Sequence, residues 1–234
     1  MSTADETYDS GTLPNKTQEQ ALIDLEESGL KFEFSCKKEK LIDSCFSYAR
    51  WLESFKKNYN LAKTEYEYLC FKKKHVKSCY RLANLFTFND EIGQNLNEAF
   101  KIFDFGCRDL RDGKSCHIAA TMLVEGLVGH GPAPTKALEF FQEGCKLKYS
   151  DACFHHGSLL YARINQKKVE KTSTNTSETI NSWIKGCELG NIFCCRNISL
   201  AYELGDFVEK DDKLAEKYRE MGKDYINNRK TNES

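Results

Sequence analysis

The chain has 234 residues, a formal net charge of −1 and 40% hydrophobic residues, a profile typical of a folded protein. Balanced, interspersed charge argues against a nucleic-acid partner, because nucleic-acid binders usually present a basic face. No stretch approaches the ~18 uncharged apolar residues that span a bilayer, so we expect no transmembrane segment. The unusual feature is the content of 11 cysteines against three methionines.

The N-terminal segment carries no recognisable targeting signal. It is acidic, has no apolar core and contains no arginine, unlike a secretory signal or a cleavable mitochondrial presequence. Taken alone, this composition indicates the cytosol or the nucleus. We expect residues 1–17 to form a flexible acidic terminus.

Apolar residues recur at helical spacing in the segments that follow. No segment alternates apolar and polar residues for long, and all three prolines fall in expected loops. The chain is therefore predicted to be all-α. The residues that carry the periodicity are Leu61, Ala62, Tyr66 and Leu69, then Leu96, Ala99, Phe100, Phe103 and Cys107, then Ala137, Leu138, Phe141 and Cys145.

Ten of the cysteines form five couples with members eight or nine residues apart, and the first members recur after 34, 37, 38 and 42 residues. A period of this size is typical of a stacked array of helical repeats. The couples are Cys36 with Cys45, Cys70 with Cys79, Cys107 with Cys116, Cys145 with Cys153, and Cys187 with Cys195. We expect the array to cover residues 18–227, with a polar inserted loop at 164–178 and a flexible end at 228–234.

Each couple is predicted to join two helices across a short turn. The first cysteine ends one helix, and the second lies in the first turn of the next, after cap-type residues at Asp43–Ser44, Ser78, Ser115 and Ser150–Asp151. Such positions come within the ~5.5 Å Cα separation that a disulfide needs. Free buried cysteines, which pack like small hydrophobes, are the alternative. Zinc is disfavoured because the chain has no Cys-x-x-Cys motif.

Cys194 breaks the even count. Either Cys194 or Cys195 is close enough in sequence to pair with Cys187, but Cys195 repeats the eight-residue step from Cys145 to Cys153. We therefore expect Cys194 to be a free thiol, buried as a spectator or otherwise reactive.

Two blocks of sequence resemble the Sel-1-like repeat family. They are residues 186–202 (GCELGNIFCCRNISLAY) and residues 144–161 (GCKLKYSDACFHHGSLLY). Five cysteine couples in a chain without a signal peptide are similar to the Sel-1-like cytochrome c oxidase assembly factors of the mitochondrial intermembrane space. The resemblance implies a right-handed α/α solenoid of about five repeats, each cross-linked by one disulfide.

The same resemblance implies a location, partners and a function. It places the chain in the intermembrane space, where disulfides persist and where import uses an oxidative machinery. It implies a scaffold that binds client subunits or other assembly factors of respiratory complex IV. No catalytic residue, metal or cofactor is required for that role, so whether the chain is an enzyme stays open, with a scaffold favoured.

Redox chemistry or cofactor handling in the same pathway is an alternative. A thiol–disulfide oxidoreductase needs one labile couple, whereas these five look alike. Haem ligation has His117 and Met122 as candidates. Five residues apart on one helix, they point about 140° away from each other and cannot both bind one iron.

Two further alternatives come from other repeat proteins. The β-lactamase-like or penicillin-binding proteins with paired-cysteine repeats need Ser-x-x-Lys together with two further elements. The first is matched by spacing alone at Ser35–Lys38, Ser54–Lys57 and Ser182–Lys185, and the other two elements are absent. A generic Sel-1-like adaptor is the remaining alternative. In either scaffold interpretation, aromatic residues such as Tyr48, Trp51, Phe86, Tyr161 and Tyr202 are candidates for a concave binding surface.

Overall fold

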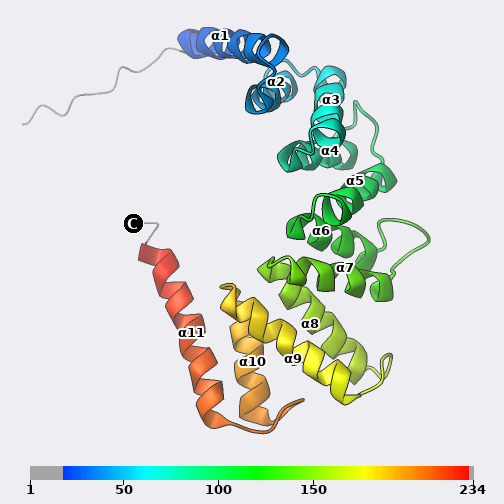
Figure 1. Ribbon diagram of the computed structural model, residues 1–234, viewed down its shortest axis with the longest axis vertical. Coiled ribbons are helices and arrows are strands. Elements are labelled where there is room, and N and C mark those ends of the chain that lie inside the picture. The colour runs from blue at the N-terminus through cyan, green and yellow to red at the C-terminus, as the bar shows by residue number, and fades with distance from the viewer. Residues whose placement is uncertain (1–17, 232–234) are drawn as a thin grey trace, which may run out of the picture. The chain divides into compact units, whose positions relative to one another are not determined.

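The computed structural model describes residues 18–231, and every regular element in that range is a helix (Figure 1). The prediction of an all-α chain is confirmed. The chain divides into two compact parts, which we describe separately: residues 18–65 and residues 66–231.

The first part contains α1 (Gln18–Lys37), α2 (Ile42–Ser54) and most of α3 (Tyr59–Glu67). α1 and α2 form a helical hairpin joined by Cys36–Cys45. Gly29 allows their close approach, because a Cβ atom there would lie 2.0 Å from a ring carbon of Trp51. The Tyr48 hydroxyl donates a hydrogen bond of 3.1 Å to Glu33 across the same interface.

The second part is a succession of hairpins in which helices adjacent in the chain pack against each other (Figure 1). It begins in α3 and continues with the elements η1 (Tyr68–Lys72, one π-helical turn), α4 (Val76–Phe88), α5 (Leu96–Arg108), α6 (Gly113–Val124), α7 (Pro134–Lys146), α8 (Ser150–Asn165), α9 (Ser173–Glu188), α10 (Ile192–Leu204) and α11 (Asp212–Thr231). We call α2, α4, α6, α8 and α10 the second helices, because each follows a short turn that is spanned by one cysteine couple. We call these turns the hairpin turns.

The five cysteine couples are the pairs that the structure joins as disulfides. Their S–S distances lie between 2.06 and 2.12 Å, and their Cα–Cα distances lie between 4.4 and 4.8 Å. In every pair the first cysteine lies in the last turns of one helical segment and the second in the first turns of the next. One bridge therefore holds each hairpin at its turn. The bridges are Cys36–Cys45, Cys70–Cys79, Cys107–Cys116, Cys145–Cys153 and Cys187–Cys195.

The starts of the second helices differ from the prediction. Asp112 caps α6 by accepting from the Ser115 backbone N–H, and Asn191 caps α10 in the same way. The other three helices start without a side-chain capping bond, and the residues that precede them are Leu41, His75 and Tyr149.

The polar residues expected as caps lie inside the helices instead. Ser78, for example, was expected to cap α4 just before Cys79. The helix already begins at Val76, however, and Ser78 and Cys79 are both buried within its first turns. The Ser78 hydroxyl lies 2.8 Å from Nδ1 of His75. The prediction was wrong here because the helices start earlier than their polar residues suggest. The same holds for Asp43, Ser44, Ser115, Ser150 and Asp151.

The ends of the first cysteine-bearing helices also depart from the prediction at one hairpin. Cys70 was expected to end an ordinary α-helix, but it lies in the π-helical turn η1, and Cys79 lies in α4 after it. Their Cα atoms are still 4.8 Å apart, which is within the range that a disulfide spans.

The polar connection expected at 164–178 is shorter. α8 continues to Asn165 and α9 begins at Ser173. The Thr172 hydroxyl accepts from the Asn175 backbone N–H and so starts the helix inside the polar run. Residues 228–231 belong to α11, whereas the predicted flexible segments at 1–17 and 232–234 lie outside the described residues.

Cys194 is a free cysteine buried between two helices. A Cβ atom added at Gly186 would lie 2.3 Å from its sulfur, so α9 and α10 cross closely at this point. Burial raises the pKa of the Cys194 thiol to about 12. The thiol is therefore protonated and sterically protected at neutral pH.

Candidate functional site

The outward face of α10 carries three exposed apolar side chains. Phe193, Leu200 and Leu204 are 54%, 40% and 74% exposed. Spacings of seven and four residues place them along one side of the helix. Side chains of this kind gathered on one face typically mark an interaction site.

The equivalent positions in the other second helices are mostly polar. Aligned on the second cysteine of each couple, they are two residues before it, five after it and nine after it. These positions hold Asp43, Arg50 and Ser54 in α2; Lys77, Asn84 and Phe88 in α4; Lys114 and Thr121 in α6, with Glu125 directly after it; and Asp151, Ser158 and Ala162 in α8. Of the five, α10 alone is apolar at all three positions.

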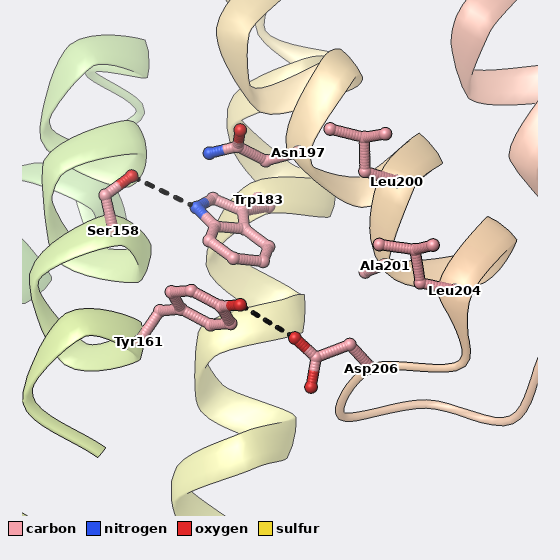
Figure 2. Close-up of a pocket in the computed structure, with 8 residues that line it drawn as sticks. All are labelled: Ser158, Tyr161, Trp183, Asn197, Leu200, Ala201, Leu204 and Asp206. Atoms are coloured by element: carbon pink, nitrogen blue, oxygen red, sulfur yellow. Dashed lines mark hydrogen bonds between the residues drawn. The ribbon is translucent and has the colours of Figure 1, made fainter. Parts of the chain in front are cut away.

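A hollow of about 270 Å³ lies on one side of this face, between α8, α9 and α10 (Figure 2). Its floor is formed by Trp183 from α9, and Leu200 and Leu204 stand on its α10 side (Figure 2). The full lining is Ser158, Tyr161, Trp183, Asn197, Leu200, Ala201, Leu204 and Asp206.

Packing and hydrogen bonds fix the aromatic side chains of the hollow. Trp183 lies against α8, where a Cβ atom at Gly157 would come within 2.7 Å of its indole ring. Its Nε1–H points at the Ser158 hydroxyl at 3.4 Å. The Tyr161 hydroxyl donates a 2.8 Å hydrogen bond to Asp206, which raises the pKa of Tyr161. The hollow is therefore preformed, with a neutral phenol at its edge.

A second hollow of about 430 Å³ lies on the other side of the same face, between α10 and α11. Phe193 and Leu200 contribute from α10, and Tyr218 and Ile226 contribute from α11. Leu200 borders both hollows, so it stands on a ridge between them. We call Phe193, Leu200 and Leu204, with the two hollows, the α10 face.

Charges lie at the edge of the α10 face. Arg219 is already paired with Glu203 at 2.9 Å. Arg196 is exposed, and no acidic side chain among the described residues pairs with it. The face can therefore bury an apolar surface of a partner, while Arg196 forms an ion pair with an acidic residue of that partner. Its geometry suits an amphipathic helix, whose side chains enter hollows at helical spacing.

The two candidate haem ligands lie apart from this face, on α6. Met122 is buried in the core, whereas His117 is half-buried beside His155 and Tyr149. The Nε2 atom of His117 is buried without a hydrogen-bond partner, and burial lowers the pKa of His117 to about 4. Within residues 18–231, no three His, Cys, Asp or Glu side chains gather as metal ligands do.

The Ser182–Lys185 motif lies in α9, with Ser182 nearly buried. The Ser182 hydroxyl donates to the Glu178 backbone carbonyl at 2.8 Å and lies 2.8 Å from Nδ1 of His156. Burial lowers the pKa of His156, against the opposing effect of Glu178. The contact between His156 and Ser182 therefore joins α8 to α9.

The aromatic candidates for a binding surface are distributed differently from the expectation. Tyr161 lies in the first hollow, but Tyr48 is buried and Tyr202 stacks on Tyr218 at 6.0 Å. Sequence reasoning missed Phe193, Leu200 and Leu204, because it looked at aromatic residues one repeat at a time. Aligning the repeats on their second cysteines would have found them.

Comparison with known proteins gives homologues over nearly the whole chain. Cytochrome c oxidase assembly factor 7 of Xenopus tropicalis is 28% identical over 222 residues, which cover 92% of this chain and 93% of that protein. The Drosophila melanogaster homologue of that factor is 28% identical, covering 84% of this chain and 85% of its own. No protein-family model matches the chain.

A solved structure decides the fold. The crystal structure of a Sel1 repeat protein from Oxalobacter formigenes superposes with a TM-score of 0.62, at 15% identity, covering 86% of this chain and 81% of the other. This chain has the Sel1-repeat fold. The predicted repeat architecture with disulfide cross-links is therefore confirmed. Paired helices build the scaffold of such a repeat array, and individual positions vary on its surface. Among residues 18–231, no helix is long and apolar enough to cross a bilayer.

Proposed function

We propose that this protein is an assembly factor for cytochrome c oxidase, respiratory complex IV, and that it acts as a disulfide-stabilised scaffold in the mitochondrial intermembrane space. The observation that carries the proposal is homology to proteins named cytochrome c oxidase assembly factor 7 along 92% of the chain.

The α10 face is the proposed binding site for a client, meaning a subunit of complex IV or another assembly factor. The occupant we propose is an amphipathic helix of the client. Its apolar side chains would enter the two hollows on either side of Leu200, and an acidic residue would pair with Arg196. Tryptophan residues in pockets, such as Trp183 here, are often the residues that contribute most to the binding energy of an interface.

The disulfides support the proposed compartment. Five buried bridges need surroundings in which glutathione and thioredoxin do not keep thiols reduced. In the chain-entropy model, each closed loop of about nine residues stabilises the fold by roughly 2.5 kcal/mol. Import through the oxidative machinery of the intermembrane space would supply these bonds.

Gene deletion tests the assembly role. In the organism that encodes the protein, deletion is expected to lower the amount of assembled complex IV and the rate of cytochrome c oxidation. The wild-type gene should restore both. Normal levels of complex IV after deletion would rule out the role.

Fractionation tests the compartment. Protein in isolated mitochondria should resist protease until the outer membrane is ruptured, and should then become accessible while matrix proteins stay protected. Trapping of free thiols at lysis should find Cys194 as the one reduced cysteine. A fully reduced protein outside mitochondria would contradict the proposal.

A further inference from the structure

The hairpin turns of residues 66–231 lie along one edge of this part of the chain. The Tyr80 hydroxyl of α4 donates to Asp112 at the start of α6. The side chain of Asn191, which precedes α10, donates to Asp151 in the first turn of α8. These contacts join the starts of successive second helices, so the turns before them follow one another along the edge.

Positive charge is concentrated at the first of these turns. Lys72, Lys73, Lys74 and Lys77 are all exposed, and no acidic residue lies between them in the sequence. Lys74 adopts a left-handed backbone conformation with φ of 55° at the tip of the turn. None of Lys72, Lys74 and Lys77 forms an ion pair within the described chain.

The charge at the later turns is largely neutralised. Arg111 also stands at a turn tip with φ of 55°, but its guanidinium pairs with Glu143 on α7. Arg108 pairs with Asp104 on its own helix. At the turn between α7 and α8, Lys148 has φ of 63° and the nearby Lys146 pairs with Glu143 at 3.9 Å. The last turn, between α9 and α10, has Gly190 at the left-handed position, with φ of 86°. The later turns carry only single lysines without an ion pair, such as Lys148, so the cluster of such lysines is local to the turn between η1 and α4.

Exposed aromatic rings accompany these lysines. Tyr68 and Phe71, both in η1, are 48% and 43% exposed. Lys73 lies over the Tyr68 ring at 5.6 Å, and Phe71 leans on Phe105 at 5.2 Å. We call Lys72, Lys73, Lys74 and Lys77, with these two rings, the basic turn. Aromatic rings beside lysines are typical of protein surfaces at a membrane interface.

We propose that the basic turn docks on an anionic lipid surface. Four lysines within six residues reach the number at which polybasic segments bind anionic bilayers. All four are lysines rather than arginines, and lysine acts as a mobile point charge that suits a diffuse anionic surface better than a bidentate carboxylate partner. The lysines lie on a protruding turn rather than in a groove, and such a shape suits contact with a flat surface such as a bilayer. The interaction is peripheral and independent of the α10 face.

Vesicle sedimentation with the full, oxidised protein tests the proposal. The protein should bind vesicles that contain phosphatidylserine in phosphatidylcholine, and should not bind phosphatidylcholine alone. Raising the salt from about 0.1 M to about 0.5 M should release it, because the attraction is electrostatic. Lys72→Gln, Lys73→Gln, Lys74→Gln and Lys77→Gln combined should lower the partition coefficient about 100-fold or more.

A matched control removes the same charge from the opposite edge. Lys167→Gln, Lys168→Gln, Lys210→Gln and Lys213→Gln change four lysines near the turns that follow α8 and α10. This variant should bind vesicles nearly as the wild type does. Absence of binding to anionic vesicles, or equal losses in both variants, would overturn the proposal. Binding of polyglutamate through the four lysines, without vesicle binding, would also overturn it and would identify an acidic protein as the partner instead.

Discussion

α6 and α10 are second helices of the same design with different outward surfaces. Each starts after an Asp or Asn cap that accepts from the backbone N–H three residues on, and each buries a disulfide cysteine in its first turns. On the outside, α6 and the residue that ends it present Lys114, Thr121 and Glu125, whereas α10 presents Phe193, Leu200 and Leu204. The junction therefore specifies the scaffold, and the outward positions are free to specify a partner.

The largest expected effect concerns what the two helices share. Removing Cys107–Cys116 or Cys187–Cys195 by paired Cys→Ser substitution should lower the free energy of unfolding by about 2–4 kcal/mol in either case. Urea unfolding followed by circular dichroism measures this. The losses should be similar, because the cysteines are nine and eight residues apart. A loss at only one of the two junctions would show that they are not equivalent.

The next largest effect is expected from the outward residues, in which α6 and α10 differ. Phe193→Lys, Leu200→Thr and Leu204→Glu together give α10 the outward residues of α6. Client capture should fall at least tenfold, because the apolar contact is lost. Stability should change by less than about 1 kcal/mol, because the side chains are exposed.

The control for this variant substitutes the equivalent outward residues of the α6 hairpin. Lys114→Gln, Thr121→Ser and Glu125→Gln should leave client capture and complex IV levels unchanged. Affinity purification of the tagged proteins from mitochondria, followed by mass spectrometry, compares the variants. Full capture by the α10 variant would show that clients bind elsewhere.

A smaller difference between the two helices is expected in how acid affects their stability. Burial first, and then His155 and Lys114, hold the pKa of His117 at about 4 against the opposing effect of Asp151. The unfolded chain, with a His pKa of ~6.5, then binds more protons than the folded chain between these values. Stability should therefore fall as the pH drops from about 6.5 towards 4, by about 1 kcal/mol at His117 after allowing for its exposed part.

α10 contains no histidine, so the acid effect should be local. Hydrogen exchange at pH 5 and pH 7 should show protection lost in α6 and α8 before α10. His117→Leu should weaken the pH dependence of the stability, because it removes the titrating group. The substitution breaks no hydrogen bond of Nε2, because this atom has no partner. A pH dependence unchanged by this substitution would exclude His117 as its source.

The smallest effect is expected at Cys194. The equivalent position in α8 holds Ala152, which packs against Gly144 as Cys194 packs against Gly186. Cys194→Ala should therefore cost about 1 kcal/mol or less and leave client capture intact. Iodoacetamide should label Cys194 only after unfolding, because the thiol is buried and its pKa is raised. Fast labelling of the folded protein would revive a reactive role.

The scaffold was more predictable than the site. Cysteine spacing located all five hairpin turns, because a local bridge and a helix–turn–helix junction impose the same short separation. Cap positions were misplaced, as at Ser78 before Cys79, because polar residues lie inside first turns as well as before them. The extent of α9 was missed because Thr172 starts a helix within a run whose composition is typical of a loop.

The candidate site was hidden for a different reason. Periodicity cannot separate an apolar side chain that faces a neighbouring helix from one that faces solvent, as Ile198 and Leu200 show. Trp183 and Tyr161 become a hollow only when α8, α9 and α10 are in place. Comparing repeats with one another supplies the missing information, because a position that is polar in most copies faces outward.

Every disulfide in this protein joins cysteines only eight or nine residues apart, with both partners within one hairpin. No bridge encloses or crosses another along the chain, so the covalent connectivity has no interlocked loops. The bonds can consequently form in any order without trapping an unformed part of the chain. Oxidation can proceed hairpin by hairpin, and a partly oxidised molecule remains an intermediate on the way to the native one.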